Sequence, residues 1–237
     1  MFSGWLDDSL DEAGRKQARH AGHTLLQHNL VPQVVHVSAL ARAQETAREM
    51  LRTAGCEQVE VHASWLLNER HYRAWQGVAK YVMRTRHGDE QYREIRRSRF
   101  ALPPAESLAD HESLIADISS RPSAGWTGVD VPWAESLDMV SERVLPYWRD
   151  AIEPDLAESR VVLVVAHSNS LRALIMLLEG LGDEQIAEVN VPLAMPLVFD
   201  YGHDGVISPL RYLEPDCAAI AAAHVACEGA TPSESGN

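Results

Sequence analysis

Apolar residues at helical spacing mark the first predicted helix. A stripe of apolar and small residues runs from Ala18 to Leu26, with members three and four positions apart. Upstream of it, Ser9 and Glu12 form a capping box, in which each side chain bonds to a free backbone amide at the start of a helix. We therefore expect a helix that begins at Ser9 and ends near Asn29.

Short runs of β-branched residues alternate with further helical stripes. The clearest strand is Val161–Val165, because an uninterrupted apolar run is typical of a strand buried on both faces of a parallel sheet. Helical stripes follow the predicted strands at residues 34–37 and 161–165. The stripe after residues 34–37 should end at Gly55. The predicted strands span residues 34–37, 59–63, 161–165 and 196–201.

This order of elements predicts an α/β fold, a three-layer sandwich with a mostly parallel central sheet. Residues 1–215 should form one domain, with a helical insertion over the sheet end at residues 70–148, and residues 216–237 an Ala/Gly/Ser-rich C-terminal tail. The helix after Ser9 has the character of a crossover helix, which normally returns from a preceding strand of the same sheet. No such strand precedes it, so we expect that the first central strand is missing from the chain.

Composition narrows the function classes. A net charge of -13 argues against a general affinity for nucleic acid or an anionic membrane, since both need a positive field. Neither a membrane-spanning run nor a signal peptide is visible, which predicts a cytoplasmic protein. The 3 cysteines lack ligand spacing, as do the His, Asp and Glu residues, so we expect reduced thiols and no metal.

A cationic segment interrupts this acidic chain. Residues 70–99 contain nine basic and three acidic residues, a net charge of +6. One interpretation is a solvated helix face, which is the usual role of a charge run. The other is a pocket for a small, highly anionic ligand, because guanidinium groups bind phosphate and carboxylate with two parallel hydrogen bonds.

Two positions carry candidate chemistry. His167 follows the Val161–Val165 strand and precedes a helix, a place where backbone amides and the helix dipole favour an anion. Glu69 stands in the sequence Asn-Glu-Arg-His-Tyr and is a candidate general acid or base, although a surface Arg–Glu pair would give the same pattern.

Ordered motifs resemble those of the cofactor-dependent phosphoglycerate mutases, in the histidine phosphatase superfamily. The resemblance covers roughly residues 2–201, and the Asn-Glu-Arg-His-Tyr block distinguishes mutases from general phosphatases of the superfamily. The matching segments are residues 3–7, 10–15, 38–43, 67–72, 76–77, 80, 88–91, 96–97, 145–148 and 166–174.

The resemblance implies an assignment of roles. Glu69 would donate and accept the proton of the substrate hydroxyl, while Arg42 and His167 would stabilise the transferring phosphoryl group. The carboxylate and second phosphate of the glycerate would be held by Arg70, Tyr72, Lys80, Arg96 and Arg97, with polar contacts from Ser3, Gly4, Ser168 and Asn169. The implied cofactor is 2,3-bisphosphoglycerate as phosphoryl donor, without a metal. A small phosphorylated acid is the implied substrate, and a homodimer or homotetramer the implied assembly.

The sequence departs from the family pattern in two places. The segment Leu-x-x-x-Arg-His-Gly-x-Ser-x-x-Asn, which carries the nucleophilic histidine of the family, should stand immediately before Phe2 and is missing. His20, His23 and His28 are expected to be solvated on the first helix and do not replace it. The family usually has glycine where this chain has Ser168.

Three functions stay open at this stage. The first is interconversion of 3-phosphoglycerate and 2-phosphoglycerate in glycolysis and gluconeogenesis, with a true start upstream of Met1. The second is a truncated, non-catalytic relative that binds phosphorylated acids or a protein partner. The third is a phosphatase of the same superfamily, against which the Asn-Glu-Arg-His-Tyr block and Arg96 and Arg97 argue.

Overall fold

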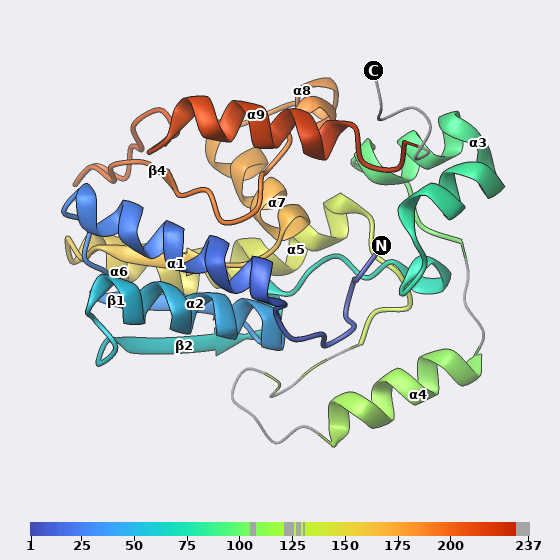
Figure 1. Ribbon diagram of the computed structural model, residues 1–237, viewed down its shortest axis with the longest axis horizontal. Coiled ribbons are helices and arrows are strands. Elements are labelled where there is room, and N and C mark those ends of the chain that lie inside the picture. Colours follow the sequence, from blue (N-terminus) through green and yellow to red (C-terminus); the bar gives the residue numbers. More distant parts are fainter. Residues whose placement is uncertain (105–107, 121–125, 127–128, 130, 231–237) are drawn as a thin grey trace.

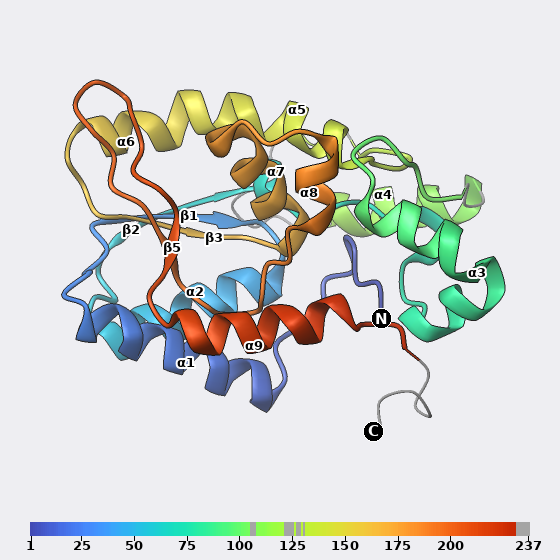
Figure 2. The same cartoon turned by 90° about the horizontal axis from the view of Figure 1, so that it is seen from above.

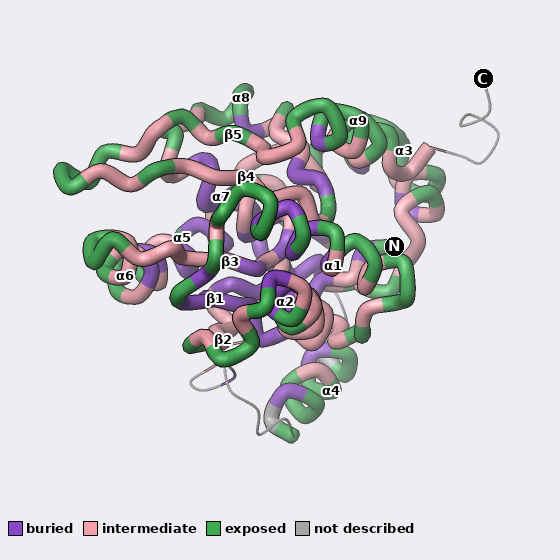
Figure 3. The backbone as a smooth tube through the Cα atoms, turned by 60° about the vertical axis from the view of Figure 1, so that its left-hand side comes forward, coloured by how far each residue is buried: buried purple, intermediate pink, exposed green. Residues whose placement is uncertain are grey.

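Three parallel strands form the centre of the computed structural model, which describes residues 1–104, 108–120, 126, 129 and 131–230 (Figure 1). The strands β1 (Val34–Ser38), β2 (Glu60–Ser64) and β3 (Val162–Val165) are arranged in the order β2-β1-β3. In the register, Val34 of β1 lies opposite Glu60 of β2 and Val162 of β3. All five residues of β1 are buried (Figure 3).

Helices cover both faces of this sheet, which confirms the predicted three-layer α/β sandwich (Figure 2). On one face lie α1 (Glu12–Gln27) and α2 (Ala41–Ala54), which pack against each other. On the other lie α5 (Leu137–Tyr147) and α7 (Ser168–Glu179), with a π-helical turn (Trp148–Ile152) and α6 (Glu153–Ala157) continuing from α5. As predicted, α2 ends at Gly55, which adopts a left-handed conformation with φ of 71°.

The first helix has its N-cap two residues later than the capping box predicted. Asp11 is the N-cap of α1, because its carboxylate accepts a hydrogen bond of 2.7 Å from the amide of Gly14. The preceding amide, that of Leu10, donates instead to the carboxylate of Glu45 in α2. This contact joins Leu10 to a neighbouring helix, and Asp11, whose backbone is extended, caps the helix in place of Ser9.

The remaining elements connect or follow those of the sandwich. Two short 3-10 helices (Trp65–Leu67 and Arg73–Trp75) lead from β2 to α3 (Lys80–Arg97), which breaks at Gly88, and α4 (Leu108–Ser119) follows. Beyond α7 come α8 (Asp183–Glu188), β4 (Leu197–Val198), β5 (Arg211–Tyr212) and α9 (Pro215–Ala226). Within the predicted insertion, α5 belongs to the helical layer against α7. The predicted tail begins with the helix α9, and its residues 231–237 lie outside the described part of the chain.

The predicted strand at residues 196–201 is shorter in the structure and is not the last one. It contributes β4, which pairs with β5 in an antiparallel two-stranded sheet separate from β2-β1-β3. A cavity of about 520 Å³ lies between the two sheets and is lined by residues of both β3 and β4. None of the described helices is both long and apolar enough to cross a membrane.

Candidate functional site

The candidate site begins where β1 and β3 end. Ser38 is the last residue of β1, and His167 follows β3 as the N-cap of α7. Their side chains meet: the hydroxyl of Ser38 lies 2.8 Å from Nε2 of His167 and donates a hydrogen bond of 2.8 Å to Oδ1 of Asn68. Since the Ser38 proton is directed to Asn68, the proton of His167 belongs on Nε2, from which it is donated to Ser38.

His167 is held in its neutral form. Burial lowers the pKa of its imidazole well below the ordinary value, and the nearby guanidinium groups of Arg42 and Arg143 lower it further. A neutral imidazole beside two cations suits the binding of an anion. A bound phosphate would offset the repulsion between the guanidinium groups and a protonated imidazole, and so would favour the imidazolium.

Arg42, in the first turn of α2, faces the N-terminal segment. Its guanidinium donates 2.6 and 2.8 Å hydrogen bonds to the carbonyl oxygens of Leu6 and Gly4. The carboxylate of Asp7 accepts a bond from the Ala41 amide at the start of α2. Burial lowers the pKa of Arg42. The carboxylates that surround Arg42, of which Glu69 has the largest effect, raise that pKa. Arg42 therefore lies within electrostatic reach of both Glu69 and His167.

At Gly4 the N-terminal segment lies close against Gln76. The φ of Gly4 is +49°, and a Cβ built on it would lie 2.1 Å from Oε1 of Gln76. That oxygen accepts a 2.6 Å hydrogen bond from the amide of Trp5. Only glycine has both the backbone conformation and the space that this position requires. Ser3 precedes it, and its carbonyl accepts a bond from the Leu6 amide.

The carboxylate of Glu69 is bound through one of its oxygens. Oε1 accepts three hydrogen bonds: 2.7 Å from the Arg70 amide, 3.2 Å from the Asn169 amide and 2.9 Å from Nδ2 of Asn169. The Asn169 side-chain amide also donates a 2.9 Å bond to the hydroxyl of Tyr72. The structure thus brings Glu69, Tyr72 and Asn169 together, as the sequence-based roles require.

A buried ion pair that the sequence reasoning missed holds the Glu69 segment in place. Arg143 of α5 pairs with Glu135 at 2.6 Å and donates to the carbonyl oxygens of Leu66, Asn68 and Glu69. Glu135 in turn accepts a 2.8 Å bond from the His71 amide. Because the two residues lie more than 60 positions from the segment they hold, no local pattern in the sequence indicates them.

Lys80 and Arg96, from the two ends of α3, form a second group of cations. Both contact the carboxylate of Glu228, Arg96 at 2.7 Å, so that the residues after α9 lie against this group. Arg96 and Tyr92 also donate to the Glu228 carbonyl oxygen at 3.0 and 2.9 Å. A carboxylate of the chain itself therefore occupies cations that were predicted to bind the carboxylate or phosphate of a substrate.

The other predicted binding residues differ in how far they face the site. Arg70 is fully buried, and its guanidinium donates to the carbonyl oxygens of Glu135, Ile95 and Ala101, which gives it a structural role. Arg97 donates a weak 3.4 Å bond to a carbonyl oxygen, and burial and the neighbouring Arg96 lower its pKa. The hydroxyl of Ser168 lies 3.5 Å from the carbonyl oxygen of Val191.

The site contains histidine, carboxylate, guanidinium and amide groups, which suit anion binding and proton transfer. Among the described residues, no group of His, Cys, Asp and Glu is arranged to hold a metal ion. His20 and His23 of α1 and its C-cap His28 are exposed, as expected.

Known proteins resemble the chain in sequence over nearly its full length. Residues 1–118 and 112–210 match the model of the histidine phosphatase superfamily (branch 1). A 2,3-bisphosphoglycerate-dependent phosphoglycerate mutase of Clavibacter sepedonicus is 42% identical over 231 residues, which cover 97% of this chain and 90% of the relative. A phosphoglycerate mutase of Candida albicans is 41% identical, covering 97% of this chain and 92% of the relative.

Solved structures resemble the chain in fold. A mycobacterial glucosyl-3-phosphoglycerate phosphatase has a TM-score of 0.62 and 22% identity, with 89% of each chain covered. A putative alpha-ribazole-5'-P phosphatase from Escherichia coli has a TM-score of 0.59 and 22% identity, covering 90% of this chain and 87% of the other. At such identities the structures support the fold, whereas the sequence relatives show the family. This chain belongs to the histidine phosphatase superfamily, among the 2,3-bisphosphoglycerate-dependent phosphoglycerate mutases.

Proposed function

We propose that this chain binds 3-phosphoglycerate and 2-phosphoglycerate at the carboxyl end of its sheet and serves their interconversion by phosphoryl transfer. The observation that carries the proposal is the arrangement around Glu69. Its carboxylate is fixed by Asn169 beside Tyr72 and lies within electrostatic reach of Arg42. The names of the sequence relatives support the same reaction.

Arg42 and His167 are assigned to the transferring phosphoryl group. The charge of that group spreads over its equatorial oxygens in the transition state, and cationic donors fixed in advance stabilise it there. Arg42 supplies a permanent charge. Burial and the guanidinium groups of Arg42 and Arg143 lower the pKa of His167, and a phosphate bound beside it would raise that pKa by offsetting the two positive charges.

Glu69 is assigned to the proton of the substrate hydroxyl. All three of the hydrogen bonds described above reach Oε1, so Oε2 is the oxygen assigned to the glycerate. A carboxylate can take the proton as the hydroxyl attacks phosphorus and return it when the phosphoryl group leaves. The Arg143–Glu135 pair acts through the backbone of this segment and is therefore a positioning element.

Tyr72, Lys80, Arg96 and Arg97 are assigned to the carboxylate and the second phosphate. Burial and the charge of Arg96 lower the pKa of Arg97, which is in keeping with two cations that lie close together. This donor set suits 2,3-bisphosphoglycerate, whose two phosphates and carboxylate need several cations. When bound, that cofactor supplies a phosphoryl group. Ser3, Gly4 and Ser168 are assigned to polar contacts around that group.

Calorimetric titration with 3-phosphoglycerate tests the binding half of the proposal. Arg96→Ala should weaken binding at least tenfold, since a charge-assisted hydrogen bond to an anion contributes about 1.5–3 kcal/mol. Arg93→Ala is the matched control, because Arg93 lies on the same helix and is 76% exposed. Equal affinities of the two variants would contradict the assignment.

The reaction itself is tested on the protein isolated from its native cells. Phosphorus NMR should show 3-phosphoglycerate converting to 2-phosphoglycerate in the presence of a trace of 2,3-bisphosphoglycerate. Glu69→Gln, introduced at the native locus, should abolish conversion and leave binding within about threefold. Release of inorganic phosphate without 2-phosphoglycerate would indicate a phosphatase instead, and binding without conversion a non-catalytic relative.

A further inference from the structure

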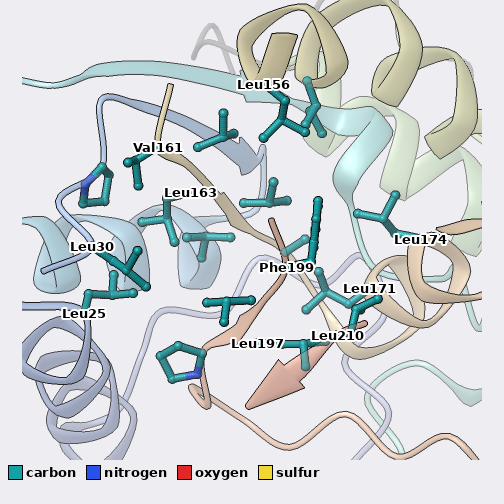
Figure 4. Close-up of a pocket in the computed structure, with 18 of the residues that line it drawn as sticks. Leu25, Leu30, Leu156, Val161, Leu163, Leu171, Leu174, Leu197, Phe199 and Leu210 are labelled. Carbon is teal, nitrogen blue, oxygen red and sulfur yellow. The ribbon is translucent and has the colours of Figure 1, made fainter. Parts of the chain in front are cut away.

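Arg172 of α7 is a buried cation to which none of the roles above is assigned. Its residue is 3% exposed, and burial lowers the pKa of its guanidinium to about 10, with a smaller contribution from the charge of Arg97. Leu171 and Leu174 of the same helix line the cavity between the two sheets (Figure 4). Arg172 does not line that cavity, and its guanidinium lies instead among α3, α8 and the side chain of Asn169.

Within the described part of the chain, the guanidinium of Arg172 donates hydrogen bonds to four oxygens, all of them neutral. Nη1 lies 3.1 Å from the carbonyl oxygen of Arg96 and 3.1 Å from Oδ1 of Asn169. Nη2 lies 3.3 Å from the carbonyl oxygen of Arg97 and 2.8 Å from that of Ile186 in α8. Packing alone does not require a charge here, because a well-packed apolar side chain is often as stable in such a buried position.

The bond to Asn169 determines which way its side-chain amide points. A guanidinium has donors but no acceptor, so the atom that faces Arg172 is the amide oxygen, and Nδ2 lies on the other side. There Nδ2 donates 2.9 Å bonds to Oε1 of Glu69 and to the hydroxyl of Tyr72. A reversed amide would place its oxygen against the Glu69 carboxylate, and the two acceptors would repel each other. Arg172 therefore fixes the donor that holds Oε1, and with it the choice of Oε2 for the glycerate.

The other bonds hold the end of α3, which carries Arg96 and Arg97. The last carbonyl oxygens of a helix have no amide partner within the helix, and a cation beside them interacts favourably with the helix dipole. The carbonyl oxygens of Arg96 and Arg97 accept from Arg172, so the backbone of both residues is held against α7. Because α7 also carries Asn169, the separation between these cations and Glu69 is set in part by the Arg172 side chain.

We propose that Arg172 is a positioning residue for phosphoryl transfer, which holds the amide of Asn169 toward Glu69 and the end of α3 in register with it. The proposal rests on the function proposed for Glu69, Arg96 and Arg97. Arg172 acts through these residues and is not assigned a contact with the substrate. A lysine would keep the charge but could not bond to Asn169 and to both carbonyl oxygens of α3 at once, because an ammonium group lacks the planar fork of a guanidinium.

The kinetics of Arg172→Lys, introduced at the native locus, test the proposal on the protein isolated from its native cells. For 3-phosphoglycerate, kcat should fall about tenfold or more and KM should rise about threefold or more, since both held groups move. Met176→Ala is the matched control, because it removes buried volume from the same helix in the core between α5 and α7. Its kcat and KM should stay within about twofold of the native values.

A double-mutant comparison separates positioning from loss of packing. If Arg172 acts on Glu69 through Asn169, Arg172→Lys should lower kcat by less than about twofold in an Asn169→Ala background. The effect on KM, which is transmitted through α3, should stay at about threefold in that background. Equal losses of kcat in the two backgrounds would overturn the proposal. Native kinetics in Arg172→Lys, or the same losses in Met176→Ala, would also overturn it.

Hydrogen exchange of the Asn169 side-chain amide, measured by NMR, gives a readout that does not need activity. Arg172→Lys should speed this exchange by about tenfold or more, because the amide turns freely once its oxygen has lost its partner, and Met176→Ala should leave it within about twofold. Unchanged exchange in Arg172→Lys would overturn the proposal. If the native chain does not convert phosphoglycerates, the proposed function fails, and faster exchange in Arg172→Lys would still show that Arg172 orients Asn169 toward Glu69.

Discussion

Replacing Glu228 by glutamine should tighten the binding of 3-phosphoglycerate. The carboxylate of Glu228 contacts both Lys80 and Arg96, so an incoming substrate must displace it from the cations proposed to bind that substrate. The substitution Glu228→Gln would keep the shape of the side chain and the bonds to the backbone carbonyl of the same residue, and would remove only the charge. Displacing the side chain of residue 228 would then cost the substrate less free energy of binding.

The structure sets the size of this effect. The side chains of Lys80, Arg96 and Glu228 are 25%, 10% and 36% exposed, so the two ion pairs are screened by solvent. Each such pair contributes about 0.5–1 kcal/mol, and the loss of both corresponds to binding that is about 5- to 30-fold tighter. The gain should shrink as salt is added, because salt screens partly exposed charges.

Titration calorimetry at low and high ionic strength measures the effect. Glu188→Gln is the matched control, since Glu188 is 76% exposed and pairs with Arg93 rather than with the proposed binding residues. Unchanged or weaker binding by Glu228→Gln, with Glu188→Gln behaving as the native chain, would refute the idea that the C-terminal segment competes with the substrate.

Three further predictions concern stability. Glu135→Ala should lower the free energy of unfolding by about 3–5 kcal/mol in urea titrations, because it leaves a buried guanidinium unpaired; a loss below about 1 kcal/mol would contradict the role given to this ion pair. Burial lowers the pKa of His71 from 6.5 to about 4, so the unfolded chain takes up a proton that the folded chain refuses. The contribution of His71 to the free energy of unfolding should be complete above pH 6.5 and should fall by up to about 3 kcal/mol as the pH decreases to 4. The His71→Gln variant should lose less stability over this range, and parallel pH profiles of the two proteins would exclude His71 as a cause. Gly4→Ala should destabilise by about 2–3 kcal/mol and Gly88→Ala by about 1, since both have positive φ but only the Gly4 Cβ would meet Gln76; equal thermal shifts would contradict this difference.

Much of the sandwich could be predicted because its signals are local. An uninterrupted apolar run gave β3, and the stripe ending at Gly55 gave α2, whose glycine adopts the expected left-handed conformation. The start of α1 could not be decided in the same way. Ser9 and Asp11 are both good caps, and the choice depended on a hydrogen bond between Leu10 and Glu45, residues that only the fold brings together.

In the candidate site, too, local signals could be read from the sequence and contacts between distant segments could not. Motifs located Glu69, Arg42 and His167, and His167 directly follows a predicted strand and its connecting alanine. The sequence could not show that the guanidinium of Arg70 donates its hydrogen bonds to carbonyl oxygens. Nor could it show that Arg143 and Glu135 hold the Glu69 backbone, because packing between distant segments brings these partners together. It also could not place Glu228 on the cations of α3, more than 130 residues away.

A crystal structure of this chain with 3-phosphoglycerate tests the central claim most directly. The account predicts the phosphate or the carboxylate of the ligand on Lys80 and Arg96, Glu228 displaced from both, and the glycerate hydroxyl within hydrogen-bond distance of Glu69. A ligand bound elsewhere, or Glu228 still paired with Lys80 and Arg96 in the complex, would contradict it.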